Sequence, residues 1–350
     1  MKQKTNRKPV VKADLFREVT DKMIAALESG TPPWRQAWQC GNEGLPANAV
    51  TGRNYSGINV MLLWADAVNK GYERNRWLTF RQAQEAGGNV RRGEKSTSVV
   101  LFKPFQKAEQ DEHGRTTTDK NGDPVLQHYH MMTSFHLFNI NQCENLPDKL
   151  CPEQPVQPEA ERITGADKII ADSCVPVKHN NGGRACYHPV ADHIIMPQAA
   201  QFRSPEDYYS TLLHELVHST GHVSRLAREG IVDCPADKHD PVYGFEELVA
   251  EMGAAFLCAD LGIQGDLQHE SYTLIHSNCR FVGRTQPAGS HTDVCSPSVF
   301  PCRLPAFRMT LGNIASWLTI LKEDKRAIFR AARYAREAFE YLTSETETCR

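Results

Sequence analysis

Residues 208–221 read YYSTLLHELVHSTG, and the letters HELVH within them carry the strongest chemical signal in the chain. On a helix, positions i and i+4 share a face, so His214 and His218 would both present imidazole nitrogens to one tetrahedral ion. Glu215 would lie beside the open coordination position and take a proton from the attacking water. The stretch predicts a zinc-type metallopeptidase site on a helix over 206–220. The alternative is an ordinary amphipathic helix with two surface histidines.

A third protein ligand would set the subclass of the site, because catalytic zinc centres use three protein ligands and keep one position open. Ser224 stands where metzincins place a third histidine, so we consider the acidic segment 244–251, GFEELVAE. Glu247 and Glu251 are four residues apart and share one face of a predicted helix over 244–261. We expect Glu247 to bind the metal and Glu251 to orient a ligand histidine, as in gluzincin-like peptidases, with the reverse assignment left open. The expected ion is Zn²⁺ or another divalent transition metal such as Mn²⁺.

The rest of the chain mixes helix-like and strand-like patterns, which predicts an α+β protein. Further helices are predicted over 13–29, 58–69 and 313–342, and strands over 97–105, 129–140 and 183–197. The last strand would be an edge strand that runs antiparallel to a bound peptide. The polar stretch 106–124 predicts a long hairpin loop, and Gly87–Lys95 predicts a hairpin tip that carries three cations.

The composition is that of a globular protein. Of the 350 residues, 40% are hydrophobic and 23% are charged, and the formal net charge is −2. No apolar run approaches the roughly 18 residues of a membrane-spanning helix, and the basic N-terminus lacks the apolar segment of a secretory signal. The 11 cysteines are odd in number and include no CxxC pair, which favours reduced thiols over a disulfide framework. We therefore expect a cytoplasmic protein that does not bind a membrane.

Charge is divided unevenly between the two halves of the chain. Residues 1–142 hold 20 basic and 14 acidic side chains, whereas residues 143–350 hold 20 basic and 28 acidic ones. In the basic half, cations are interleaved with aromatic residues, and single-stranded nucleic acid needs both, because cations meet phosphates and flat rings stack on unpaired bases. The candidate contacts are Trp34, Arg53, Tyr55, Arg76, Trp77, Arg81, Arg91, Arg92 and Lys95. The alternative is that the tryptophans are core residues and the cations only solvate the surface.

The order of these landmarks resembles the ArdC antirestriction family of conjugative plasmids over nearly the whole chain. The resemblance rests on Pro33-Trp34, Thr51-Gly52-Arg53, Trp77-Leu78-Thr79-Phe80, Gly88 to Lys95, Phe138-Asn139, His214 to Gly221, Glu246 to Phe256 and Lys322 to Phe329. It implies an N-terminal domain that binds single-stranded DNA, similar to a domain of conjugative primases, and a C-terminal zincin-like domain. It also implies that the protein shields incoming plasmid DNA from host restriction endonucleases.

With this resemblance, we expect a mixed α/β single-stranded-DNA-binding domain at 1–145, a proline-rich linker at 146–162 and a zincin-like metallopeptidase domain at 163–350. The family pattern passes almost directly from Glu270-Ser271-Tyr272 to Ile314, whereas about forty residues intervene in this chain. We interpret 273–312 as an atypical insert.

Three functions are compatible with these observations. The first is antirestriction by a protein that binds single-stranded DNA and carries an active metallopeptidase site, with host restriction components or another protein as its substrate. The second is a DNA-coating protein whose metal is purely structural. The third is a general cytoplasmic metallopeptidase with a basic targeting domain. Loss of Glu215 would abolish the function of an active peptidase and leave that of a coating protein intact.

Overall fold

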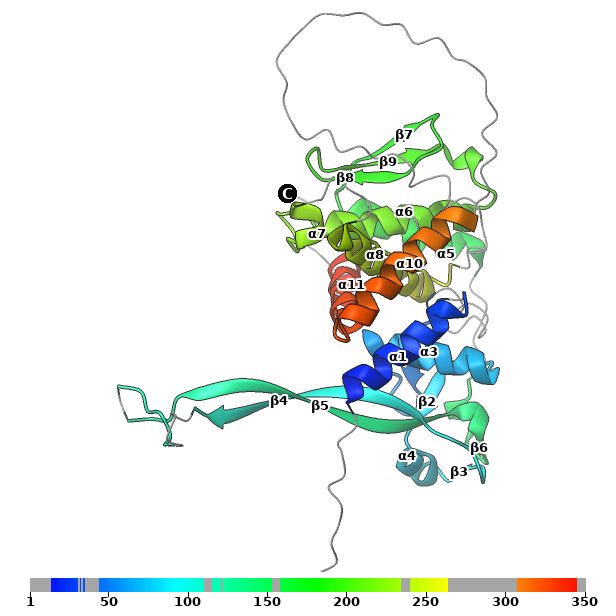
Figure 1. Ribbon diagram of the computed structural model, residues 1–350. Coiled ribbons are helices and arrows are strands. Elements are labelled where there is room, and N and C mark those ends of the chain that lie inside the picture. The colour runs from blue at the N-terminus through cyan, green and yellow to red at the C-terminus, as the bar shows by residue number, and fades with distance from the viewer. Residues whose placement is uncertain are drawn as a thin grey trace, which may run out of the picture.

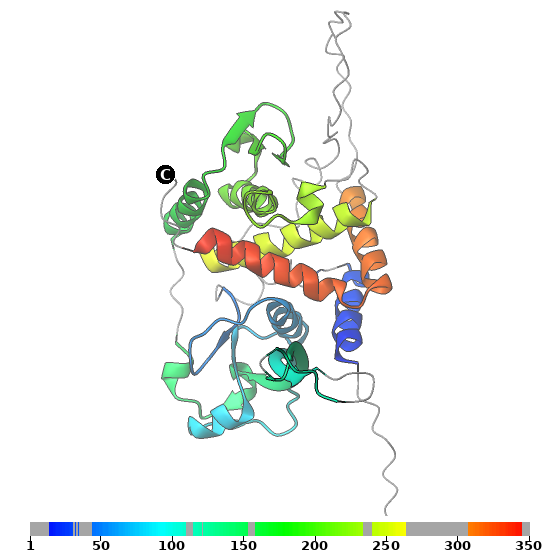
Figure 2. The same ribbon diagram turned by 90° about the vertical axis from the view of Figure 1, so that its left-hand side faces the viewer.

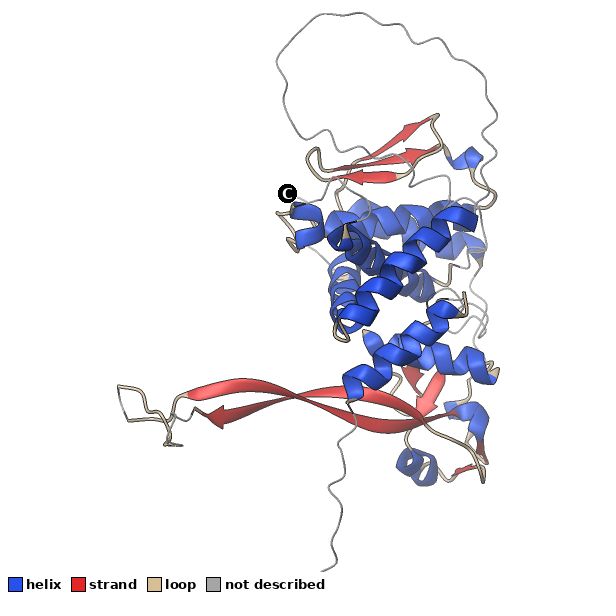
Figure 3. Cartoon of the chain, in the orientation of Figure 1, coloured by secondary structure: helices blue, strands red, loops and turns tan. Residues whose placement is uncertain are grey.

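The computed structural model describes residues 14–30, 32, 34, 44–109, 115–120, 122–152, 158–233, 240–263 and 307–344. Helices and sheets are both present, and they form an N-terminal region below a largely helical C-terminal region (Figures 1 and 3). This confirms the α+β class. Within the described residues, no helix is long and apolar enough to cross a membrane. The predicted insert at 273–312 lies almost entirely outside them.

The N-terminal region is built on a four-stranded sheet with the order β1-β2-β5-β4. Its strands are β1 (Ala47–Asn48), β2 (Arg76–Leu78), β4 (Thr97–Ala108) and β5 (Leu126–Asn139). β1 and β2 pair in parallel, which requires a crossover connection, and helix α3 (Ile58–Lys70) provides it. The predicted helix over 58–69 is thereby confirmed. The buried side chains of α3 pack on the strands around Trp77 and Leu137.

The strands β4 and β5 form a long two-stranded arm that projects from the body (Figure 1). Their antiparallel register runs without interruption from Thr97 opposite Leu137 to Ala108 opposite Leu126. Both predicted strands are confirmed, and β4 extends to Ala108, into the stretch 106–124 that the sequence predicted as loop. Val99 and Leu137 bury the base of the arm in the N-terminal core, whereas Leu126 farther out is 50% exposed.

A short helix and a second small sheet complete the N-terminal region. Helix α4 (Phe80–Glu85) begins at a capping box formed by Thr79 and Gln82, and it leads to β3 (Asn89–Val90). β3 pairs with β6 (Cys143–Glu144), which follows the 3-10 turn η2 (Ile140–Gln142). The prediction of a hairpin tip at Gly87–Lys95 is therefore wrong, because its strand pairs with one that comes much later in the chain.

The linker predicted over 146–162 is partly structured. It starts with the 3-10 turn η3 (Asp148–Leu150), and its last residues belong to helix α5 (Glu159–Asp172), which begins the C-terminal region. A three-stranded sheet of order β7-β9-β8 follows, with β7 (Val177–Asn180), β8 (Cys186–His188) and β9 (His193–Pro197). The single strand predicted over 183–197 is wrong, because a turn at 189–192, with Asp192 at a positive φ of 44°, folds it into the hairpin β8–β9. β8 is nevertheless an edge strand.

The helices that follow the sheet form the centre of this region. After the 3-10 turn η4 (Ala199–Gln201) come α6 (Pro205–Thr220), α7 (Glu229–Val232) and α8 (Pro241–Leu261). The helices predicted over 206–220 and 244–261 are thereby confirmed. Among the described cysteines, Cys174 is disulfide-bonded, whereas Cys143, Cys151, Cys186 and Cys258 are free thiols.

The predicted C-terminal helix over 313–342 is two helices, α10 (Phe307–Glu323) and α11 (Ala327–Thr343). The break occurs at Asp324, whose carboxylate accepts hydrogen bonds from the backbone N–H of Arg326 (2.8 Å) and from the Arg330 guanidinium (2.6 Å). A side chain that satisfies backbone groups locally competes with a continuing helix, which explains the turn. In Figure 2, α11 runs between α3 on one side and the helices α6 and α8 on the other.

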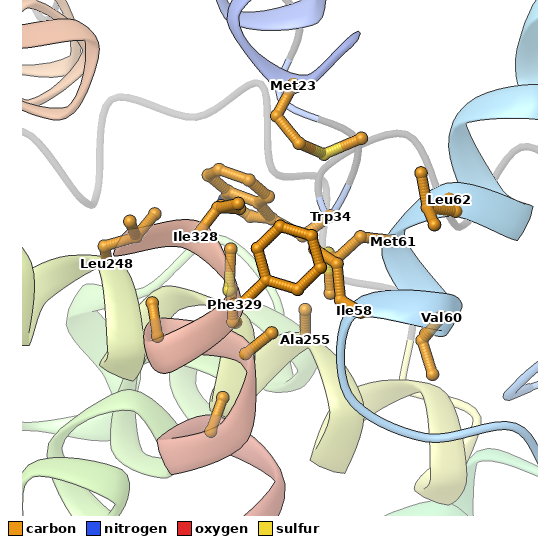
Figure 4. Packing of buried hydrophobic residues seen from close by; sticks show 14 of the residues in the cluster. Met23, Trp34, Ile58, Val60, Met61, Leu62, Leu248, Ala255, Ile328 and Phe329 are labelled. Atoms are coloured by element: carbon orange, nitrogen blue, oxygen red, sulfur yellow. The ribbon is translucent and has the colours of Figure 1, made fainter. Parts of the chain in front are cut away.

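One hydrophobic core joins the two regions. Helix α1 (Leu15–Glu28), the helix predicted over 13–29, packs on α10 and contributes Met23, while α3 contributes Met61. These side chains meet Leu248 of α8 and Phe329 of α11 around Trp34 (Figure 4). The N-terminal region is therefore seated on the helix α8 that carries the predicted acidic ligand.

Candidate metal centre

The HELVH segment lies in the middle of α6, and the local sequence accounts for this helix. Ser204 caps it by accepting a hydrogen bond from the Asp207 N–H (3.1 Å), and Pro205 occupies the first turn, where no backbone donor is needed. His214 is fully buried and His218 is 7% exposed. The alternative of two surface histidines therefore does not hold.

Helix α8 crosses α6 at very short range. A β-carbon at Gly253 would lie 2.9 Å from both methyl groups of Val217, a distance that only glycine tolerates without a shift of its neighbours. This close approach places the acidic residues of α8 opposite the histidines of α6. Glu247 is 3% exposed and points its carboxylate at both imidazoles.

His214, His218 and Glu247 converge on one point. The two histidine Nε2 atoms are 3.2 Å apart, and the Glu247 carboxylate oxygens lie 3.5 Å from His218 Nε2 and 3.7 Å from His214 Nε2. Ligands that bind zinc tetrahedrally at about 2.0–2.1 Å lie roughly 3.3–3.4 Å from one another. The three side chains thus have nearly the spacing that a divalent transition metal requires, and within the described residues they are the one such group.

A buried ion pair lies behind His218 on the side away from the other ligands. Glu246 Oε1 is 3.3 Å from His218 Nδ1, and the same carboxylate pairs with Arg228 at 2.6 Å. Arg228 also donates to the Val217 carbonyl (2.8 Å) and to the Thr220 hydroxyl (2.6 Å), both on α6. Metal-binding histidines commonly use their second nitrogen in this way, which fixes the ring and the tautomer.

The sequence interpretation missed Glu246 and Arg228. Glu246 directly precedes the predicted ligand Glu247 in the sequence, and this adjacency was the signal that could have identified it. The expected orienting residue, Glu251, lies one turn farther along α8 and is 7% exposed. For His218, the carboxylate behind the ring is that of Glu246.

The acidic surroundings favour a cation at this point. Burial opposes protonation of His218, but the hydrogen bonds to Glu246 and Glu247 outweigh it and raise the pKa of His218 to about 10. Burial likewise opposes ionisation of Glu246, yet the charge of Arg228 and the bond to His218 hold its pKa below the usual range. A proton and a divalent metal therefore compete for the imidazole of His218.

Glu215 lies beside this cluster and faces the edge strand. Its Oε2 accepts a hydrogen bond from the backbone N–H of Tyr187 in β8 (2.8 Å), while Oε1 is buried and has no hydrogen-bond partner among the described residues. An uncompensated carboxylate oxygen in a buried site is costly and is typical of a functional group that awaits a ligand. A network at the turn after β8 holds the strand, since Arg225 donates to the Tyr187 hydroxyl (3.0 Å) and to Asp192 (3.0 Å).

The structure removes two residues from the predicted nucleic-acid surface. Trp34 is 1% exposed and packs edge-on against Trp317, and Trp77 is fully buried against Tyr72. Neither indole offers a ring face to solvent, so the prediction that they stack on bases is wrong. They are core residues.

The other predicted contacts occupy different environments. Arg53, Arg81, Arg91, Arg92 and Lys95 are exposed, whereas Tyr55 and Arg76 are half-buried. Arg91 bonds to the carbonyl of Cys143 and to Glu94, so it fastens the turn after β3 to the neighbouring strand. Tyr55 accepts a hydrogen bond from Asn48 (3.3 Å), and burial raises the pKa of its hydroxyl.

Two buried histidines on one helix, an acid from a second helix and an edge strand above them define a zincin-like metalloprotein. Family comparisons agree: residues 164–277 match the family of zincin-like metallopeptidases, and residues 13–138 match the N-terminal domain of anti-restriction factor ArdC.

Two bacterial proteins are similar to this chain over nearly its whole length. The uncharacterized protein y4eC of Sinorhizobium fredii is 30% identical over 97% of this chain and 95% of its own length. The DNA primase TraC of Escherichia coli is 32% identical over 95% of this chain, which spans only 27% of that primase.

Solved structures show the same likeness over whole chains. Two structures of the antirestriction protein ArdC from plasmid R388 are similar to this chain, each with 33% sequence identity. The metal-free form has a TM-score of 0.67 and covers 94% of this chain and 96% of its own. The Mn(II)-bound form has a TM-score of 0.64 and covers 95% of this chain and 100% of its own. The chain belongs to the ArdC antirestriction family.

Proposed function

We propose that this protein protects incoming plasmid DNA from host restriction, with an N-terminal half that binds single-stranded DNA and a C-terminal half that holds a divalent transition metal in a metallopeptidase-like site. The convergence of His214, His218 and Glu247 at near-tetrahedral spacing carries the metal part of the proposal. The basic N-terminal half and the R388 relative's name support the antirestriction part. We place the protein in the cytoplasm, where incoming DNA meets restriction enzymes.

The ligands differ in what they contribute. His214 and His218 supply neutral nitrogen donors, and Glu247 supplies one negative charge, a set that suits Zn²⁺ and also Mn²⁺. When bound, such an ion polarises a carbonyl and makes a water more acidic. Glu246 and Arg228 keep the His218 ring oriented toward the ion.

Glu215 would act as the general base of peptide hydrolysis. The Tyr187 N–H holds one carboxylate oxygen, so the other is left to accept a proton from water and return it to the leaving amine. Among the described residues, no strand pairs with the outer edge of β8, and an extended peptide of a restriction component or another protein would pair with that edge.

Glu215→Gln tests the chemistry because it keeps the shape and removes the base. We expect this variant to bind metal and DNA like the original chain and to lose all proteolysis. Glu229→Gln, an exposed change on α7, serves as the matched control. Proteolysis that persisted in Glu215→Gln would exclude the assigned role.

A coating protein with a purely structural metal is the second candidate, because this function would require only the exposed cations of the N-terminal half. Conjugation of a restriction-sensitive plasmid separates the two functions. If Glu215→Ala protects as well as the original chain, and a variant with Arg53, Arg92 and Lys95 neutralised does not, then coating is the function. Loss of protection in Glu215→Ala supports an active site.

A further inference from the structure

Phe80 is the first residue of α4 and is 50% exposed, although an aromatic side chain gains most by burial. Its ring packs against Phe138 of β5, with the ring centroids 6.3 Å apart and the planes tilted by 60°. The contact fixes the ring in place and leaves half of its surface to solvent. The four described tryptophans, in contrast, are all buried.

The turn after β1 packs against α4, the helix that begins at Phe80. Asn48 hydrogen-bonds the Gln82 side chain in α4 (3.2 Å), and Ala49 packs in the same small core cluster as Ala83 of α4. These contacts bring the exposed residues Val50 (47% exposed) and Arg53 to the surface around α4. We call Val50, Arg53, Phe80 and Arg81 the Phe80 patch.

The charge of this surface indicates what covers it. The Arg81 side chain is 85% exposed and its charge is shared with Glu85 at 2.7 Å, while the Arg53 side chain has no acidic partner among the described residues. Arg92 and Lys95 add two exposed cations on the turn after β3, the strand that contacts α4. An apolar ring framed by cations is complementary to an anionic chain with flat, exposed bases.

We propose that Phe80 is the base-stacking residue of this protein and that the Phe80 patch is where a single strand of DNA binds. The inference rests on the DNA-binding part of the proposed function and locates the DNA-binding surface at the Phe80 patch. A duplex is a poor fit, because its bases are already stacked on one another. The arginines would contact the backbone phosphates on either side of the stacked base.

Binding of a fluorescent oligo(dT) strand to the full chain tests the proposal. We expect Phe80→Ala to weaken binding roughly 5- to 150-fold, the range found for loss of one stacking contact. Phe80→Trp should bind at least as tightly as the original chain, and Phe80→Leu should bind like Phe80→Ala because it is apolar but cannot stack. Phe102→Ala, which truncates another phenylalanine that is 42% exposed, is the matched control and should bind normally.

Arg53→Gln gives an independent readout, since each lost phosphate contact on a single strand should reduce the slope of log K against log salt by about 0.7. If Phe80→Ala and Phe102→Ala bind alike, or if Phe80→Leu binds as well as Phe80→Trp, the stacking role is wrong while DNA binding stands. If the original chain does not bind oligo(dT), the DNA-binding part of the proposed function fails first.

Discussion

Replacement of Arg228 by Met removes the cation that holds Glu246 behind the metal ligand His218. The side chains of Arg228 and Glu246 are only 3% and 5% exposed, so the remaining buried carboxylate would lose its arginine and keep only His218 as a cationic partner. Arg228 also makes the bonds to Val217 and Thr220 that tie the segment before α7 to α6. Loss of one partner from a buried ion pair costs about 3–5 kcal/mol, and we expect Arg228→Met to lower the free energy of unfolding by that amount.

Urea unfolding in the presence of a chelator measures this loss without a contribution from bound metal. The control is Arg333→Met, which breaks an exposed i,i+4 pair with Glu337 at 3.7 Å and should cost about 0–1 kcal/mol. The double variant Arg228→Met, Glu246→Gln should be more stable than the sum of the single losses predicts, by about 0.5–3 kcal/mol, since the two groups interact directly. Equal stability of Arg228→Met and Arg333→Met would refute the assignment of a buried supporting pair.

Three further outcomes follow from the same geometry. The pKa of His218 is about 10 in the folded metal-free chain against 6.5 for an unperturbed histidine, so its protonation stabilises the fold fully below pH 6.5 and this contribution is lost as the pH rises toward 10. Metal uptake in that window should therefore release a proton, which calorimetry in buffers of different ionisation enthalpy detects. Gly253→Ala should cost about 1–3 kcal/mol because its methyl group would overlap Val217, whereas Gly183→Ala, with open space around it, should be nearly neutral in thermal unfolding. Trp34→Ala should cost about 3–5 kcal/mol in unfolding experiments, because the side chain is a core residue and not a DNA contact.

The local part of the metal site was predictable from the sequence, because two histidines four residues apart share a helix face whatever surrounds the helix. The distant part was harder. Glu247 was selected by its place in an acidic helical segment, but which of its neighbours would support His218 depends on how α8 crosses α6. That crossing is set by the contact between Gly253 and Val217, and it puts Glu246 behind the ring.

The DNA surface shows the limit of composition as a guide. Trp34 and Trp77 stand among arginines in the sequence, yet the first closes the core between the two regions and the second lies under α3. Phe80 lies in the same aromatic and basic stretch, and the sequence pattern does not distinguish its 50% exposed ring from the fully buried Trp77 three residues earlier. The exposure of Phe80 depends on the capping box at Thr79, which starts α4 so that the ring lies at the surface.

The metal content of the purified chain and its variants tests the central claim most directly. Elemental analysis should find one divalent transition-metal ion per chain, retained by Glu251→Gln and lost by Glu247→Gln and by His214→Ala. A chain that neither contains nor takes up such an ion, or one that loses it in Glu251→Gln and keeps it in Glu247→Gln, would contradict the site described above.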